Sequence, residues 1–161
     1  MNARRWLHEH SLKLLAIRDT PQAIAGGVAI GIFFGFMPLF GLKTLLAILF
    51  AWLTRSNILA AVLAGTAHDV ALPFMPAIYF WEYKLGYRLL NGHWPVSVVR
   101  HILSQENWRS WARFVTVGKP LLLGATVCGA PLAAVAFFVA HTVVARHQRK
   151  KLQQETAAHV G

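Results

Sequence analysis

The stretch GFMPLFGLKT, residues 35–44, lies within a run of 35 residues, 20–54, whose only formal charge is Lys43. A run this apolar suits a lipid bilayer, yet it carries a proline, a glycine and a lysine in its middle. Pro38 removes a backbone hydrogen-bond donor and disfavours helical backbone at the residue before it. We therefore expect Pro38 and Gly41 to form a structural turn between two helices, with Lys43 at the start of the second helix.

The helices predicted on either side of this turn, residues 22–37 and 42–53, are both short. Sixteen helical residues rise about 24 Å, whereas the hydrocarbon core of a bilayer is roughly 30 Å thick. We expect either a re-entrant hairpin or two thin, tilted spans. The first helix carries Gly27, Gly31 and Gly35 four residues apart, a spacing that lets another helix backbone pack closely. This glycine face is expected to pack helices together and to support a homo-oligomer.

The composition places the chain in the membrane class. Of its 161 residues, 56% are hydrophobic and only 14% are charged, and the mean hydropathy is +0.46. The net charge of +10 is concentrated toward the two ends, where basic residues flank apolar runs. A nucleic-acid-binding protein carries its basic residues on a polar surface instead, so we expect the lipid bilayer as a partner and no nucleic acid. Basic termini also predict a multi-pass protein with its N and C termini in the cytoplasm.

A second broken hairpin is predicted further along the chain. A polar turn with Arg55 and Asn57 follows the first hairpin, and a short apolar stretch then leads to breaks at Pro73 and Pro76. The segment at 71–90 is long enough to cross a bilayer, as is a later one at 120–145. An alternative has four short crossings followed by a last segment that does not cross.

Together these patterns predict an all-α, polytopic integral membrane protein with broken or re-entrant short helices and an interfacial amphipathic helix. We expect a single membrane domain, 1–161. Its parts are an N-terminal interfacial helix (1–19), a core of two broken helical hairpins (20–90), an interfacial helix (91–119), a transmembrane helix (120–145) and a basic cytoplasmic tail (146–161).

Six polar side chains at or near membrane depth form a candidate polar membrane site, because charge at that depth is costly. They are Lys43, Arg55, Asn57, His68, Asp69 and Glu82. Lys43 could meet a phosphate or carboxylate, or could extend to the interface. The adjacent His68 and Asp69 could relay a proton or hold a cation, or could cap a helix junction. Arg55 could meet a lipid phosphate or Asp69, and for Glu82 we favour structural pairing with Lys43 or Arg55.

The motifs of several enzyme classes are missing from the sequence. It has no GxSxG, HExxH, P-loop or GxGxxG pattern. Cys128 is the single cysteine, so neither an intrachain disulfide nor a thiolate cluster can form. No further histidine and carboxylate set follows His68 and Asp69 at metal-ligand spacing. We therefore expect no catalytic residues, no metal and no cofactor. A membrane hydrolase using His68 and Asp69 stays open, but a role that is not enzymatic is favoured.

Three segments give the sequence a family resemblance. They are TPQAIAGGVAIGIFFGFMPLFGLKT (20–44), LAILFAWLTRSN (46–57) and IYFWEYKLG (78–86). They resemble the bacterial membrane proteins catalogued as domain of unknown function 2062, in the Ser/Thr-Pro start, the glycine-rich helix with its Pro-x-x-Gly turn, the Arg-x-Asn turn and the aromatic helix. The resemblance implies that Pro38, Gly41 and Lys43 form the first turn and Arg55 and Asn57 the second. Many members have glutamine where Lys43 stands.

The resemblance also implies a place in the bacterial inner membrane, with no settled activity. Some members are fused to glycosyltransferase domains, which would suggest handling of envelope lipids or polysaccharides. Two classes of function follow. The protein could form a translocation path or a binding site for an ion, a small metabolite or a lipid headgroup. Alternatively, it could be an accessory scaffold that docks an envelope-lipid enzyme through a helix at 95–117.

Overall fold

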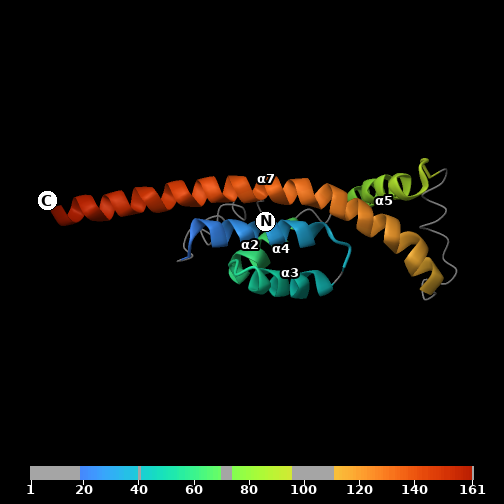
Figure 1. The fold of residues 1–161 in the computed structure, drawn as a ribbon, viewed down its shortest axis with the longest axis horizontal. Coiled ribbons are helices and arrows are strands. Elements are labelled where there is room, and N and C mark those ends of the chain that lie inside the picture. The colour runs from blue at the N-terminus through green and yellow to red at the C-terminus, as the bar shows by residue number, and fades with distance from the viewer. Residues whose placement is uncertain (1–18, 40, 70–73, 96–110, 161) are drawn as a thin grey trace.

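The computed structural model describes residues 19–39, 41–69, 74–95 and 111–160. Within these ranges the chain forms five helices and no strands, which confirms the all-α prediction (Figure 1). The helices are α2 (Pro21–Phe36), α3 (Leu42–Leu53), α4 (Ile58–Asp69), α5 (Met75–Asn91) and α7 (Trp111–Val160). The N-terminal helix expected at 1–19, Pro73 and most of the interfacial helix expected at 91–119 lie outside the described residues.

The chain turns between α2 and α3 at the two residues expected to form the turn, Pro38 and Gly41. α2 begins at Pro21 after a Thr20 cap and ends before Met37, whose extended backbone (φ −71°, ψ 130°) is what a following proline favours. Gly41 has a φ of +79°, in the left-handed region that favours glycine, and α3 starts at the next residue. Local chemistry alone accounts for this break.

α2 lies at the centre of the fold, because it packs against α3, α4 and α7. Two of its glycines make the approach of α4 close. A Cβ atom added at Gly27 would collide with the Asn57 carbonyl, and one added at Gly31 would collide with the Ala61 carbonyl. These two glycines therefore pack helices within one chain, so a homo-oligomer would need another surface.

α7 is longer than the transmembrane helix expected at 120–145. It runs without interruption from Trp111 to Val160, with Pro120 and Pro131 inside it. A proline inside a helix costs about 3 kcal/mol, so the sequence favours a start or a kink at these positions. Packing on both sides of Pro131 offsets this cost: Ala125 lies in a core cluster with residues of α2 and α3, and Val144 lies in a second cluster with residues of α2 and α4.

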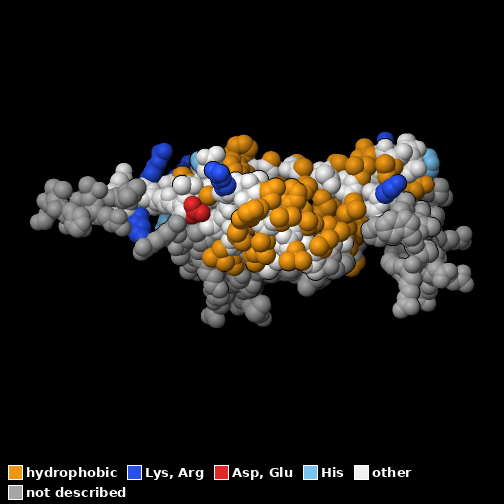
Figure 2. Space-filling model, turned by 60° about the horizontal axis from the view of Figure 1, so that its bottom comes forward, with side chains coloured by type: hydrophobic (Ala, Val, Ile, Leu, Met, Phe, Trp, Pro, Cys, Tyr) orange, Lys and Arg blue, Asp and Glu red, His pale blue; other side chains and the backbone are white. Residues whose placement is uncertain are grey.

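α7 also contains the single segment of the described chain that is long and apolar enough to cross a membrane, Val117–Lys151. Only 17% of its most apolar 18-residue stretch is buried inside the protein, so it is not the core helix of a globular bundle. Between Val127 and Val143 it exposes six large apolar side chains: Val127, Leu132, Val135, Phe138, Val139 and Val143. Figure 2 shows hydrophobic side chains gathered over the middle of the molecule, with Lys and Arg toward both ends. This distribution supports an association with membranes.

The second span expected at 71–90 is not found among the candidate spanning helices of the described residues. α5 has 17 residues and carries Glu82, Lys84 and Arg88 within them. Three charged groups in so short a helix lower its hydropathy below that of a spanning helix. α5 packs on α7 toward the end of α7 opposite the C-terminus (Figure 1).

Candidate functional site

The six residues predicted to form one polar site lie at three separate places along the backbone. Lys43 lies in the first turn of α3, beside the last turns of α4, where the backbone of His68 and Asp69 lies. Arg55 and Asn57 lie at the turn that joins α3 to α4, at the opposite end of both helices. Glu82 lies on α5 against α7. The sequence indicated which residues are unusual, but not that the fold separates them.

The turn between α3 and α4 closes with the hydrogen bonds of a Schellman motif. The Ser56 N–H donates to the Ala51 carbonyl at 2.8 Å, and the Arg55 N–H donates to the Trp52 carbonyl at 3.1 Å. Arg55 holds the position at which glycine is usual, with a φ of +54°. A residue with a side chain is strained there by about 1 kcal/mol. An arginine at this position suggests that its side chain makes a favourable interaction that offsets the strain.

Arg55 borders an open hollow of about 500 Å³, which we call the Arg55 hollow. Its lining residues are Trp52, Leu53, Arg55, Ser56 and Ile58. The Trp52 and Leu53 side chains are 68% and 62% exposed. An arginine that lines the same hollow as an exposed tryptophan and apolar residues is typical of the membrane–water interface, where arginine recognises phosphate and tryptophan lies at headgroup level.

Asn57 ties this turn to the start of α2 and to α7. Its side-chain oxygen accepts a hydrogen bond from the Ala60 N–H at 2.7 Å and so caps α4. Its amide group donates to the Asp19 carboxylate at 3.1 Å, and the Gln148 amide of α7 donates to the Asp19 backbone carbonyl at 2.8 Å. The Arg55 hollow therefore lies at the same end of the molecule as the basic part of α7. That part carries the exposed side chains of Arg146, Arg149, Lys150 and Lys151.

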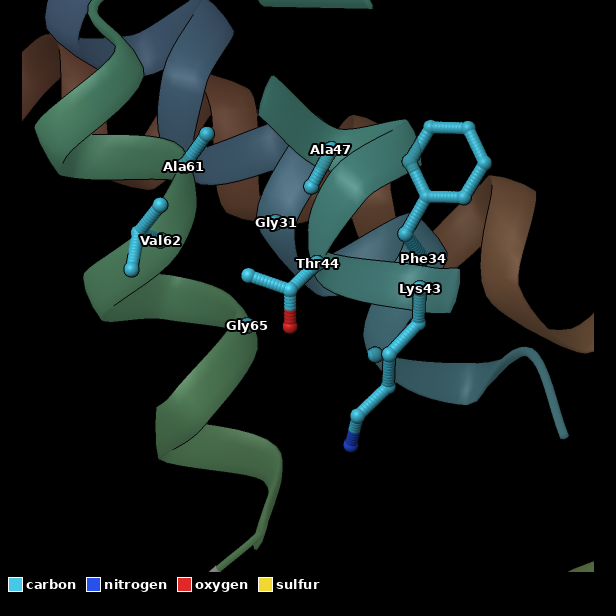
Figure 3. A pocket seen from close by; sticks show the side chains of 9 residues that line it. Gly31, Phe34, Lys43, Thr44, Ala47, Ala61, Val62 and Gly65 are labelled. Carbon is cyan, nitrogen blue, oxygen red and sulfur yellow. The ribbon is translucent and has the colours of Figure 1, made fainter. Parts of the chain in front are cut away.

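Lys43 and Thr44 stand at the mouth of a small cleft between α2, α3 and α4 (Figure 3). Gly31 and Gly35 of α2 and Gly65 of α4 line it, so much of its wall is backbone. The cleft encloses about 10 Å³, which is space for about one water molecule. It is too narrow to serve as a passage for a metabolite.

The side chains of His68 and Asp69 lie outside the described part of the chain. Their suggested roles as a proton relay, a cation site or a helix cap therefore stay predictions. Among the described residues there is no group of three or more His, Cys, Asp or Glu side chains that could hold a metal ion.

Glu82 is the one charged side chain buried in the described core, with 1% of its surface exposed. Neither of its carboxylate oxygens has a hydrogen-bond partner among the described residues, so the predicted pairing with Lys43 or Arg55 is not formed there. The reason is position, because Lys43 and Arg55 lie at the two ends of α3, and α5 packs on α7. Burial raises the pKa of Glu82 from 4.5 to about 7.

Two further features lie near Glu82 along α5, and the sequence did not predict the first. The first is the crossing of α5 and α7: a Cβ atom at Gly86 would collide with the Pro120 carbonyl, and one at Gly124 with the Glu82 carbonyl. Single glycines in helices give no periodic signal, which is why this crossing was missed. The second is the position of Lys84, whose ammonium nitrogen lies 5.0 Å from the Trp81 ring centre and 5.5 Å from that of Trp94.

In its described residues, the fold and its exposed apolar surface define a small, all-helical protein with one helix long and apolar enough to cross a membrane. A family model described as an uncharacterized protein conserved in bacteria, DUF2062, matches residues 4–153. The chain belongs to this family, as its glycine-rich helix and two turns indicated. No curated protein and no solved structure matches the chain.

Proposed function

We propose that the protein is an integral membrane protein that binds the phosphate of a lipid headgroup at the Arg55 hollow. The observation that carries this proposal is the arginine in left-handed backbone beside an open hollow. Glycine would relieve the strain at this position but would remove the guanidinium. The guanidinium offers a planar set of donors that matches two phosphate oxygens at once.

The surroundings of the hollow suit the headgroup layer of a bilayer. The hydrogen bonds through Asp19 hold the turn beside the start of α2 and the basic end of α7. From this end of α3, the apolar side chains of Leu49 and Leu45 follow Trp52 along the helix. The Leu49 side chain is 47% exposed and the Leu45 side chain is 62% exposed. A lipid could thus place its phosphate at Arg55 and its acyl chains along α3, because apolar surface of this kind is favourable against hydrocarbon.

A translocation path is less well supported. The cleft beside Lys43, one of the six residues of the candidate polar site, has space for about one water molecule. The scaffold hypothesis depends on the segment at 95–117, most of which lies outside the described residues, so it stays a prediction. Binding of a headgroup needs neither a passage nor that segment.

The test is a binding titration of the detergent-purified protein, followed by native mass spectrometry or intrinsic tryptophan fluorescence. Three soluble probes separate the sources of phosphate: a short-chain phosphatidylglycerol, a short-chain phosphatidylcholine and inorganic phosphate. Arg55→Gly should weaken binding of phosphatidylglycerol by about tenfold or more, because a charge-assisted hydrogen bond contributes about 1.5 to 3 kcal/mol. Arg55→Lys should bind with intermediate affinity.

A matched control is Arg88→Ala, which removes an arginine at the other end of the molecule, where its guanidinium lies 4.4 Å from the Trp94 ring centre. This variant should bind phosphatidylglycerol like the unmodified protein. The thermal stability of Arg55→Gly should be equal or higher, which separates loss of binding from loss of fold. Equal affinities of Arg55→Gly and the unmodified protein would disprove the proposal.

A further inference from the structure

The crossing of α5 and α7 buries a carboxyl group that has no hydrogen-bond partner among the described residues. Glu82 faces α7 where the two backbones approach most closely, since Gly124 lies against the Glu82 backbone and Gly86 lies against Pro120. At these points the two backbones are too close for a Cβ atom to fit between them. The side chain is 1% exposed, and both of its carboxylate oxygens lack a hydrogen-bond donor in the described residues.

Within the described parts of α5 and α7, no basic group bonds to the Glu82 carboxylate. On α5, Lys84 lies two residues away and is therefore on another face of the helix, where its ammonium group lies over aromatic rings. Tyr79 and Tyr83 are the tyrosines nearest to it along α5. On α7, the facing residues are Gly124 and, one helical turn further on, the thiol of Cys128, while Lys119 is exposed.

An ionised carboxylate in such a place loses its hydration and gains nothing in return, whereas the neutral carboxylic acid loses much less. The two protonation states therefore differ in how well they tolerate the closed crossing. Because the crossing is held by close backbone contact instead of by long side chains, a small separation of the helices would admit water to the carboxylate.

We propose that Glu82 is a proton-binding site that holds α5 on α7 while its carboxyl group is neutral and loosens this crossing when the group ionises. The ligand is a proton, exchanged with water as the carboxylic acid becomes a carboxylate. The pKa of Glu82, raised by burial to about 7, places the change near neutral pH. The inference does not depend on phosphate binding at the Arg55 hollow, which lies at the other end of the fold.

Cys128 provides a native reporter for this crossing. It is the single cysteine of the chain, it is partly buried, and it lies four residues after Gly124 on the same side of α7. Loosening of α5 should make its thiol more accessible. No engineered label is needed, so the protein can be studied in lipid nanodiscs as it is.

The experiment measures the rate at which N-ethylmaleimide labels Cys128 between about pH 5 and about pH 9, in the unmodified protein and in Glu82→Gln. The variant keeps the shape of the side chain but cannot ionise, so it corrects for the ordinary rise of thiol reactivity with pH. The negative charge of Glu82 itself disfavours the Cys128 thiolate and would lower the labelling rate, so a rise in the rate reports access to the thiol. The ratio of the two rates should be about one at the acidic end and should rise about threefold or more above pH 7. Glu82→Leu is a second neutral variant and should behave like Glu82→Gln.

Infrared spectroscopy tests proton binding directly. The absorption of a protonated carboxylic acid should disappear as pH rises through neutrality, and Glu82→Gln should lack this change. A labelling ratio that is constant with pH would overturn the proposal. So would a carboxyl group that is already ionised throughout this range.

Discussion

Two helix crossings in this molecule use glycine in the same way and differ in how they treat polar groups. Where α2 meets α4, Gly27 and Gly31 lie against the backbone of the partner helix. Where α5 meets α7, Gly86 and Gly124 do the same. Hydrogen bonds join the polar side chains of Asn57 and Asp19 beside the first crossing, whereas the second buries Glu82 with no partner among the described residues.

The two crossings have the same kind of close packing but differ in the electrostatics of the polar groups beside them. Close glycine contact supplies van der Waals attraction in both places, and in a membrane this attraction is a main source of helix association. At the first crossing, hydrogen bonds add to it. At the second, an ionisable group opposes it whenever that group is charged. We therefore expect the first crossing to be permanent and the second to depend on pH.

The largest effect is expected from removing the close approach itself. Gly31→Val and Gly86→Val would each place a branched side chain where a carbonyl oxygen of the neighbouring helix lies, so each should destabilise the fold by more than about 3 kcal/mol. The measurement is the free energy of unfolding in mixed micelles of mild detergent and dodecyl sulfate.

Gly65→Ala is the control for these variants. A Cβ atom at Gly65 would lie 3.5 Å from the nearest atom, the Gly31 carbonyl oxygen, which is an ordinary contact. This variant should be neutral or more stable by about 0.5 to 1 kcal/mol, because alanine favours helix over glycine. If it destabilised as much as Gly31→Val, close approach would not explain the role of these glycines.

The next effect concerns the pH dependence of stability. The pKa of the Glu82 carboxyl is about 7 in the fold, against an ordinary value of 4.5, so the folded protein binds this proton more tightly than the unfolded chain. The stability that this bound proton contributes is fully present below about pH 4.5, falls as the pH rises toward 7, and is lost above pH 7. The total change is about 3 kcal/mol, from about 1.4 kcal/mol for each pKa unit.

Glu82→Gln should remove this dependence. At about pH 8 the variant should be more stable than the unmodified protein by up to about 3 kcal/mol, and at about pH 4 the two should be nearly equal. Unfolding curves at a series of pH values measure the difference. Parallel profiles for the two proteins would show that Glu82 finds a partner or water when charged.

The helices on either side of the first turn could be predicted from sequence because their limits depend on local chemistry. Pro38 determines the backbone of the residue before it, Gly41 supplies a positive φ, and Thr20 with Pro21 starts α2. The regular spacing of the first glycines likewise predicts close packing, although it cannot say whether the partner is α4 or a second chain.

The rest depends on contacts between distant parts of the chain. The bond between Gln148 and Asp19 joins residues 129 apart, and no local pattern indicates it. The continuity of α7 through Pro131 depends on packing against α2. The sequence also indicated that a charge at Glu82 would be unfavourable at membrane depth. That the carboxylate has no partner among the described residues follows from the place where α5 crosses α7.

The smallest effect is expected beside the first crossing, at Asn57. Asn57→Ala removes the cap of α4 and the bond to Asp19, and should cost about 1 to 2 kcal/mol. Asn57→Ser keeps a capping oxygen but is too short to reach Asp19, so it should lose only about half as much.

Asn57→Asp also keeps the cap but places two carboxylates about 3 Å apart, so it should be the least stable of the three at neutral pH. Its stability should recover when Asp19→Asn is added. Thermal unfolding of the unmodified protein and of these four variants in one detergent measures the order. If Asn57→Ala and Asn57→Ser were equally stable, the link to Asp19 would contribute nothing, and glycine packing with the cap would hold the first crossing alone.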